Sequence, residues 1–251
     1  HTVFHDPARG ITLQIGNGQD IASITGIKTI NDFRSQDLSL GGQGAPLVPI
    51  GDKLLFQDYD YCLNLGGFAN ISYESAGLRI GYDISPCNLV LNTLSRHLGK
   101  DFDKDGIIAR QGRLIDNLYE ALNGLSYYAI DPPKSLGKEW VDREVIPLIQ
   151  DNDPSDLLRT YTEHIAYQVA KNIRGRTLVT GGGAYNQFLM ERLIDLADYE
   201  ITIPDDLTIQ YKEALVFAFL GLLRYRNEIN VLSSVTGSGR DHSAGTIHIP
   251  C

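Results

Sequence analysis

The chain has 251 residues, of which 43% are hydrophobic and 21% are charged, and its formal net charge is −9. This composition is typical of a globular protein and argues against a disordered chain. The acidic balance disfavours non-specific binding to nucleic acid or to an anionic membrane surface, although a phosphate site needs only local backbone donors and a few cations. We therefore expect neither a nucleic-acid partner nor a membrane partner.

The cysteines indicate a reducing environment. Cys62, Cys87 and Cys251 are odd in number and form no C-x-x-C pair, which disfavours a disulfide framework and a zinc ribbon. No apolar run approaches the length of a membrane span, and no signal peptide is visible. We therefore expect a cytoplasmic protein.

The first part of the chain is rich in glycine and in β-branched residues. Residues 11–15 and 21–24 are predicted as two short extended runs, because apolar and polar residues alternate in the first of them. Residues 41–46, Gly-Gly-Gln-Gly-Ala-Pro, cannot form regular structure. This stretch is a candidate hinge or ligand loop.

The remainder alternates strands with helices. Residues 61–65 and 68–73 are predicted as a hairpin around Gly66-Gly67, followed by a strand over residues 78–83 and a helix over residues 88–98. Most of the next hundred residues are predicted to be helical, most clearly residues 155–173, which Ser155 can cap. A strand over 177–180, a helix over 186–197, a strand over 200–204 and a helix over 212–226 follow. This alternation predicts an α/β protein.

Two glycine turns that follow strands are candidate nucleotide-binding sites. Without a side chain, glycine lets backbone N–H groups approach phosphate or ribose oxygens, and a helix after the second turn would add the positive end of its dipole. Two tight turns without a ligand remain the alternative. The candidate residues are Gly66, Gly67 and Asn70 at the first turn, and Gly181, Gly182, Gly183 and Asn186 at the second.

Asp83 and Arg34 are the candidate reactive and substrate-binding residues. Asp83 ends a predicted strand, where α/β proteins bind their ligands, and it could act as a general base or merely cap the helix after Pro86. Arg34 precedes the 41–46 loop and could hold a carboxylate or a phosphate with two hydrogen bonds, or form a surface salt bridge.

Residues 32–34 (Asp-Phe-Arg), Asp37 and residues 41–49 together resemble the signature of the anhydro-N-acetylmuramic acid kinases. The resemblance continues in order through residues 12–16, 25–27, 64–71, 133–135, 181–183, 213–218 and 235–237, and so covers nearly the whole chain. Each segment alone is weak, whereas the ordered set is highly specific.

This resemblance implies a ribonuclease-H-like fold of the actin and hexokinase type, with one complete lobe and the remnant of a second. The complete lobe is expected at residues 34–227, and residues 1–33 and 228–251 should pair with each other as the remnant. ATP, accompanied by Mg²⁺ held largely through water, would lie between the lobes against the two glycine turns. The sequence does not fix the oligomeric state, and a homodimer is one arrangement that it allows.

The resemblance also implies an unusual sugar-kinase reaction, which serves in peptidoglycan recycling. Water attacks the anomeric carbon of a 1,6-anhydro sugar, the bridge opens, and the released O6 takes the γ-phosphoryl group of ATP. Asp83 matches the family's catalytic base, and Arg34 and Glu213 would position the sugar.

Two departures from the family qualify this prediction. After Asp83 the family has Thr-Gly-Pro-Gly-Asn, whereas this chain has Ile-Ser-Pro-Cys-Asn at residues 84–88. A non-catalytic or regulatory relative therefore stays an alternative, whereas a pure actin-like or chaperone-like ATPase would not need the sugar-side residues. The family's first phosphate loop, of the type Gly-Thr-Ser-x-Asp-Gly, is absent from a chain that begins at His1. We therefore expect a longer natural protein, and residues 1–251 alone to be inactive, with apolar surface exposed.

Overall fold

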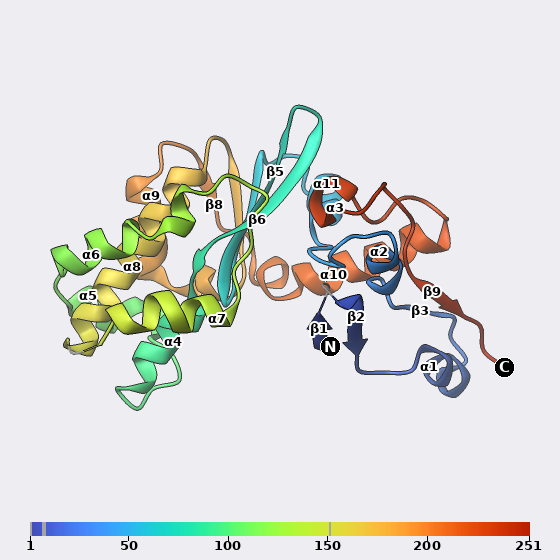
Figure 1. The fold of residues 1–251 in the computed structure, drawn as a ribbon, viewed down its shortest axis with the longest axis horizontal. Coiled ribbons are helices and arrows are strands. Elements are labelled where there is room, and N and C mark those ends of the chain that lie inside the picture. The colour runs from blue at the N-terminus through green and yellow to red at the C-terminus, as the bar shows by residue number, and fades with distance from the viewer. Residues whose placement is uncertain (1, 7–8, 151) are drawn as a thin grey trace. The chain divides into compact units, whose positions relative to one another are not determined.

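A computed structural model of the chain describes residues 2–6, 9–150 and 152–251 (Figure 1). Its contacts form two compact units, the first made of residues 1–57, 74–80 and 212–251 and the second of residues 58–73 and 81–211. The predicted lobes, with boundaries at residues 33/34 and 227/228, remain a prediction, and the compact units divide the chain at other positions. Among the described residues, no helix combines the length and the apolar character that crossing a membrane requires.

A five-stranded mixed sheet runs through the second unit in the order β6-β5-β4-β7-β8. β4 pairs antiparallel with β5 and parallel with β7, and β7 pairs parallel with β8. Ala76 and Gly77 join β5 to β6 with φ angles of 51° and 78°, as a tight hairpin requires. The strands are β4 (Tyr61–Leu65), β5 (Phe68–Ser75), β6 (Leu78–Pro86), β7 (Thr177–Thr180) and β8 (Ile201–Thr202).

The order of these strands identifies the fold. Numbered along the chain they lie in the order 3-2-1-4-5, with the second antiparallel to the first, which is the ribonuclease-H-like arrangement. The predicted α/β class is therefore confirmed. Because β4 and β7 are parallel neighbours, their carboxyl ends lie at the same edge of the sheet.

Helices cover this sheet, with α8 at their centre (Figure 1). One face of α8 is an apolar stripe, because Leu158, Tyr161, Ile165 and Val169 are all fully buried. The predicted Ser155 cap is wrong, since the carboxylate of Asp153 accepts hydrogen bonds from the first backbone N–H groups. The helices are α4 (Asn88–Arg96), α5 (Ile107–Gln111), α6 (Asp116–Asn123), α7 (Lys138–Trp140), α8 (Pro154–Asn172) and α9 (Gln187–Leu196).

The first unit contains two small antiparallel pairs, β1 with β2 and β3 with β9. The second pair joins residues 29–31 to residues 246–248. The strands are β1 (Thr2–Asp6), β2 (Ile11–Gln14), β3 (Thr29–Asn31) and β9 (Thr246–His248), and the helices are α1 (Gly18–Thr25), α2 (Ser35–Ser39), α3 (Pro49–Leu55), α11 (Ser233–Thr236) and α10 (Asp206–Tyr225), which begins in the second unit.

Residues 21–24, predicted to be extended, lie instead in helix α1. Asn17 caps the helix through its side-chain oxygen, which accepts from the backbone N–H groups of Gln19 and Asp20. Gly26, with φ of 67°, ends it in a left-handed conformation. These local signals outweigh the β-branched composition that suggested a strand.

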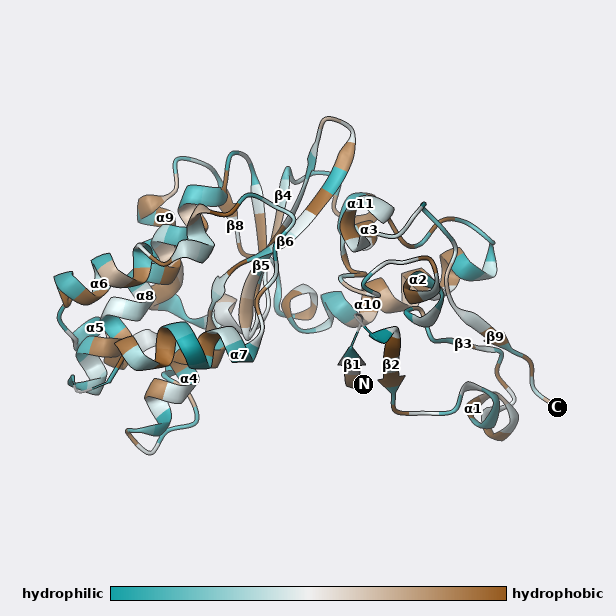
Figure 2. Cartoon of the chain, viewed as in Figure 1, coloured by the Kyte–Doolittle hydropathy of each residue, from teal (hydrophilic) through white to brown (hydrophobic). Residues whose placement is uncertain are grey.

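The first unit packs α3 and the second half of α10 around one apolar cluster, which Phe33 joins from the side. The cluster consists of Leu47, Ile50, Val216, Leu220, Leu223, Val231 and Ala244. By contrast, the hairpin formed by β1 and β2 exposes apolar residues (Figure 2), with Phe4 49% and Leu13 55% exposed. The predicted irregular loop at residues 41–46 is also observed.

Candidate functional site

The two glycine turns lie side by side at one edge of the sheet. Asn64 of β4 is in register with Thr180 of β7, so the Gly66-Gly67 turn and the Gly181–Gly183 turn follow adjacent parallel strands. Ligands of α/β sheets bind beside the carboxyl ends of such strands. The turns therefore lie on the side of the sheet where such folds bind ligands, and nucleotide binding by them stays a prediction.

The glycines of these turns fall into two kinds. A Cβ on Gly181 would stand 2.6 Å from the side-chain oxygen of Asn64 and 2.9 Å from the backbone of Leu65, and Gly181 has φ of 85°. A Cβ on Gly183 would also overlap Leu65. These two glycines are thus required by the packing of the turn against β4.

Gly67 and Gly182 face open space instead. Both are exposed, and a Cβ would meet nothing within 4 Å at Gly67 and only the amide nitrogen of Asn88, 3.9 Å away, at Gly182. Packing within the described residues does not explain why these positions lack side chains. Close approach by a ligand to the backbone would explain it.

The start of helix α4 is bonded to the first glycine turn. The backbone N–H groups of Cys87 and Leu89 donate to the carbonyl of Gly67, and that of Asn88 donates to the carbonyl of Gly66. The Asn88 side chain also donates to the carbonyl of Leu65, at 2.9 Å. The segment after the candidate base is therefore fixed to the turn, a role that sequence reasoning did not assign to Asn88.

The two candidate asparagines have different local roles. Asn70 stands opposite Asn64 in the β4–β5 ladder and is half-buried. Asn186 caps α9, because its side-chain oxygen accepts from the backbone N–H of Leu189. Since Asn186 already serves the helix, nucleotide contact from this residue stays a prediction.

Asp83 lies near the end of β6 and does not cap the helix that follows. Residue Cys87 occupies the cap position of α4, and its side chain makes no capping hydrogen bond. Instead, Oδ2 of Asp83 accepts the backbone N–H of Leu136 at 2.9 Å. Among the described residues no donor reaches its other oxygen, Oδ1, which leaves that oxygen available to a water molecule.

The surroundings of Asp83 make it a stronger base than an exposed carboxylate. Burial raises the pKa of Asp83, and the hydrogen bond from Leu136 only partly offsets this. The hydroxyl of Tyr127 donates to the Asp83 backbone carbonyl at 2.6 Å and so fixes the strand at this residue. A carboxyl group with a raised pKa at the end of a strand is typical of catalytic sites.

Lys134 lies over the face of Tyr127, with its nitrogen 4.7 Å from the ring centroid. It also donates to the Tyr127 backbone carbonyl at 3.3 Å, and burial lowers its pKa. The segment from Lys134 to Leu136 thus joins Tyr127 and Asp83. In the sequence, residues 133–135 stand out only through the family resemblance. No motif within the segment indicates that it lies next to Asp83.

A buried polar chain lies further inside. Nδ1 of His164 is 2.7 Å from the side-chain oxygen of Asn123, which can only accept, and Nε2 is 2.9 Å from the Tyr128 hydroxyl. The proton is therefore on Nδ1, and Tyr128 donates to Nε2. Burial lowers the pKa of His164 to about 3, so the ring is neutral at physiological pH.

Cys87 is an unreactive buried thiol. It is fully buried, and burial raises the pKa of its thiol to about 12. Full burial and a raised thiol pKa both disfavour nucleophilic chemistry at this position.

The sugar-side candidates lie in the first unit. Arg34 is half-buried and donates from Nη1 to the carbonyl of Gly44 at 2.6 Å. Burial lowers the pKa of Arg34, while the negative charge of the exposed Glu213 on α10 acts in the opposite direction. Arg34 therefore does more than form a surface salt bridge. One of its N–H groups donates to the loop, and the negative charge of Glu213 acts on its guanidinium.

The structure gathers the predicted residues into two groups, one in each compact unit. Asp83 and the glycine turns belong to the second unit, and Arg34 and Glu213 belong to the first. Among the described residues, no three His, Cys, Asp or Glu side chains gather in a way that could hold a metal ion.

Comparison with known proteins gives a consistent result along the chain. The sequence profile of the family described as "Anhydro-N-acetylmuramic acid kinase" matches residues 1–250. A protein of that name from Aliivibrio fischeri is 37% identical, over 98% of this chain and 73% of its own. Its namesakes from Vibrio parahaemolyticus and Gloeobacter violaceus are 38% and 36% identical, over 98% of this chain and 72% of theirs.

Solved structures resemble the chain more distantly. The activator of the 2-hydroxyisocaproyl-CoA dehydratase from Clostridium difficile with bound ADPNP is 15% identical, with a TM-score of 0.43, and the match covers 67% of this chain and 61% of that one.

Proposed function

Because the chain belongs to the anhydro-N-acetylmuramic acid kinase family, we propose that the protein opens the 1,6-anhydro bond of anhydro-N-acetylmuramic acid with water and phosphorylates the released O6 with ATP. The product would be a 6-phosphate of the open sugar, formed during peptidoglycan recycling. The single observation that carries the catalytic assignment is Asp83, whose carboxylate caps no helix and whose pKa burial raises.

Asp83 would act as the general base. Leu136 holds Oδ2, so Oδ1 can take a proton from a water molecule as the water oxygen bonds to the anomeric carbon. The bond between the anomeric carbon and O6 breaks, and O6 bonds to the γ-phosphorus as ADP leaves. The proton on Asp83 then returns to solvent, which restores the base.

The exposed backbone at the two glycine turns would receive ATP. Gly67 and Gly182 leave room for phosphate and ribose oxygens to approach the main chain, and the packed glycines Gly181 and Gly183 hold the second turn against β4. Positioning and charge stabilisation supply most of the catalysis in phosphoryl transfer, so a rigid cradle is what the reaction needs.

Mg²⁺ would enter with the nucleotide. We expect the ion to be carried mainly by phosphate oxygens and water. No step of the mechanism is therefore assigned to a protein-bound metal. Arg34, with donors left over from its bond to Gly44, would hold the acidic side chain or a hydroxyl of the sugar, assisted by Glu213.

The experiment is an assay of phosphate transfer from ATP to anhydro-N-acetylmuramic acid by the full-length protein. We expect turnover at a rate typical of sugar kinases, and a loss of about 10²–10⁴-fold when Asp83 is replaced by Asn. A protein that binds both substrates but transfers no phosphate would instead be a non-catalytic relative. An Asp83→Asn variant with normal turnover would remove Asp83 from the mechanism.

A further inference from the structure

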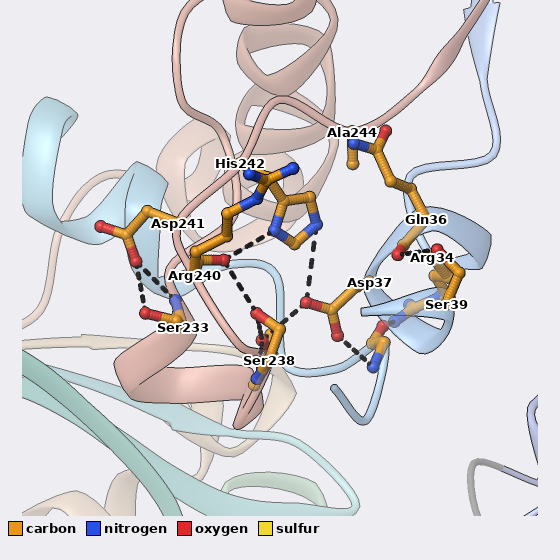
Figure 3. Close-up of polar contacts among 12 residues, drawn as sticks. Arg34, Gln36, Asp37, Ser39, Ser233, Ser238, Arg240, Asp241, His242 and Ala244 are labelled. Carbon is orange, nitrogen blue, oxygen red and sulfur yellow. Dashed lines mark hydrogen bonds and ion pairs between the residues drawn. The ribbon is translucent and has the colours of Figure 1, made fainter. Parts of the chain in front are cut away.

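Asp37 is a fully buried carboxylate next to the glycine loop at residues 41–46, and the proposed mechanism does not use it. Figure 3 shows Asp37 among polar groups of the same region, and the labelled ones come from residues 34–39 and 233–244. A buried carboxylate is costly unless it is hydrogen-bonded or paired, so its partners indicate what it stabilises.

The partners of Asp37 come from the loop and from the C-terminal segment. Oδ2 accepts the backbone N–H of Gly44 at 2.6 Å, and Oδ1 accepts the hydroxyl of Thr236 at 2.7 Å. Nε2 of His242 lies 3.6 Å from Oδ1, while Nδ1 of the same ring donates to the carbonyl of Arg240. The carboxylate that accepts the N–H of Gly44 is therefore itself surrounded by polar groups of the C-terminal segment.

The loop is shaped around this carboxylate. A Cβ on Gly42 would overlap the Asp37 carboxyl group, so only glycine fits at position 42. Two backbone bonds complete the clamp, from the N–H of Gln43 to the carbonyl of Thr236 and from the N–H of Gly239 to the carbonyl of Leu40. These contacts hold the part of the loop that leads to Gly44.

Gly44 in turn holds Arg34. Its N–H donates to Asp37, and its carbonyl accepts Nη1 of Arg34 at 2.6 Å. The residue Gly44 thus links a buried carboxylate to the guanidinium of Arg34, on which the charge of Glu213 acts. Displacing Gly44 would free one end of the guanidinium, and a planar donor group recognises its ligand only in a fixed orientation.

We propose that Asp37 is a positioning residue for sugar binding, which acts through Gly44 to orient Arg34. This inference rests on the proposed function, since it takes Arg34 as a sugar-binding residue. Asp37 itself touches no substrate. Its carboxylate sets the shape of the loop, and the loop sets the direction of the remaining Arg34 donors.

The test is a double-mutant cycle between Asp37 and Arg34, read as the Kd of the anhydro sugar by calorimetry on the full-length protein. Asp37→Ala is expected to weaken sugar binding by about 10–100-fold, while the Kd for ATP changes less than about twofold. Asp37→Asn should recover part of the loss, because an amide oxygen can still accept from Gly44. In an Arg34→Ala background, Asp37→Ala should cause no further loss, because both changes remove one interaction.

Asp241→Asn is the matched control. Asp241 is an exposed carboxylate of the same cluster that binds the backbone and hydroxyl of Ser233 and has no bond to the loop. Its substitution should leave the sugar Kd unchanged. If Asp37→Ala does not fold, Gly42→Ala replaces it, because a Cβ there would overlap the Asp37 carboxyl group.

The outcomes separate this inference from the proposed function. If Arg34→Ala weakens sugar binding but a folded Asp37→Ala or Gly42→Ala does not, the function stands and the positioning role is refuted. The positioning role is also refuted if the losses of sugar-binding free energy in Asp37→Ala and Arg34→Ala add in full in the double variant, because independent effects are additive. If Arg34→Ala leaves the sugar Kd unchanged, the sugar-binding role of Arg34 fails and the inference falls with it.

Discussion

Gly181 and Gly182 are neighbours in one turn, yet alanine should have opposite effects at the two positions. At Gly181 the added Cβ would stand 2.6 Å from the Asn64 side chain and 2.9 Å from the Leu65 backbone, at φ of 85°. β4 cannot yield easily, because it is bonded to β5 on one side and to β7 on the other. Backbone strain of about 1–3 kcal/mol and overpacking of about 1–3 kcal/mol together predict a loss of about 2–6 kcal/mol in the free energy of unfolding.

At Gly182 the nearest atom to a new Cβ is 3.9 Å away, and the backbone conformation suits any residue. The free energy of unfolding should therefore change by less than about 0.5 kcal/mol. The Kd for ATP should nevertheless rise by about tenfold or more, because the methyl group would stand where the nucleotide approaches.

Urea unfolding and ATP binding of the two variants, measured side by side, test this reasoning. The expected pattern is a destabilised Gly181→Ala, and a stable Gly182→Ala that binds ATP weakly. Equal stability of the two variants would refute the packing argument. Normal ATP affinity in Gly182→Ala would remove this turn from the nucleotide site.

Three further predictions concern titrating groups. The activity of the wild type should fall with decreasing pH as Asp83 becomes protonated, with a midpoint above the ordinary carboxyl value of 3.8, because burial raises the pKa of Asp83; a midpoint at or below 3.8 in kcat/KM would contradict this. Since the folded-state pKa of Asp83 is raised, ionisation opposes folding above 3.8, so Asp83→Asn should have a higher Tm than the wild type at pH 7 and no such advantage at pH 3. Burial lowers the pKa of His164 from 6.5 to about 3, so the free energy of unfolding should fall by up to about 1.4 kcal/mol per pH unit as the pH drops below 6.5. His164→Gln should flatten that slope in denaturation curves between pH 6 and pH 4.

The regular elements of the second unit could be predicted because local signals agree with the final fold. Residues 61–65 and 177–180 are short, mainly apolar runs that glycine follows directly, and both are strands of the sheet. The α8 stripe is equally local, because a repeat of 3.6 residues is visible in any amphipathic helix. The prediction of an extended run at residues 21–24 was wrong, because the β-branched residues there favour a strand while the capping Asn17 favours helix α1.

The partners of the site residues could not be predicted, because they are distant in sequence. The N–H that holds the Asp83 carboxylate comes from Leu136, 53 residues further along the chain. Thr236, which bonds Asp37, is 199 residues away. The types and positions of reactive residues can thus be proposed from a sequence, whereas their hydrogen bonds and pKa shifts depend on the folded chain.

The most direct test of the account is the reaction of the full-length protein with ATP and anhydro-N-acetylmuramic acid in water enriched in ¹⁸O, followed by mass spectrometry of the product after brief turnover. We expect an open sugar 6-phosphate that carries one ¹⁸O atom at the anomeric position and forms with the release of ADP, and about 10²–10⁴-fold less of this product from Asp83→Asn. A phosphorylated sugar that keeps its anhydro bridge, or a labelled product formed equally well by Asp83→Asn, would contradict it.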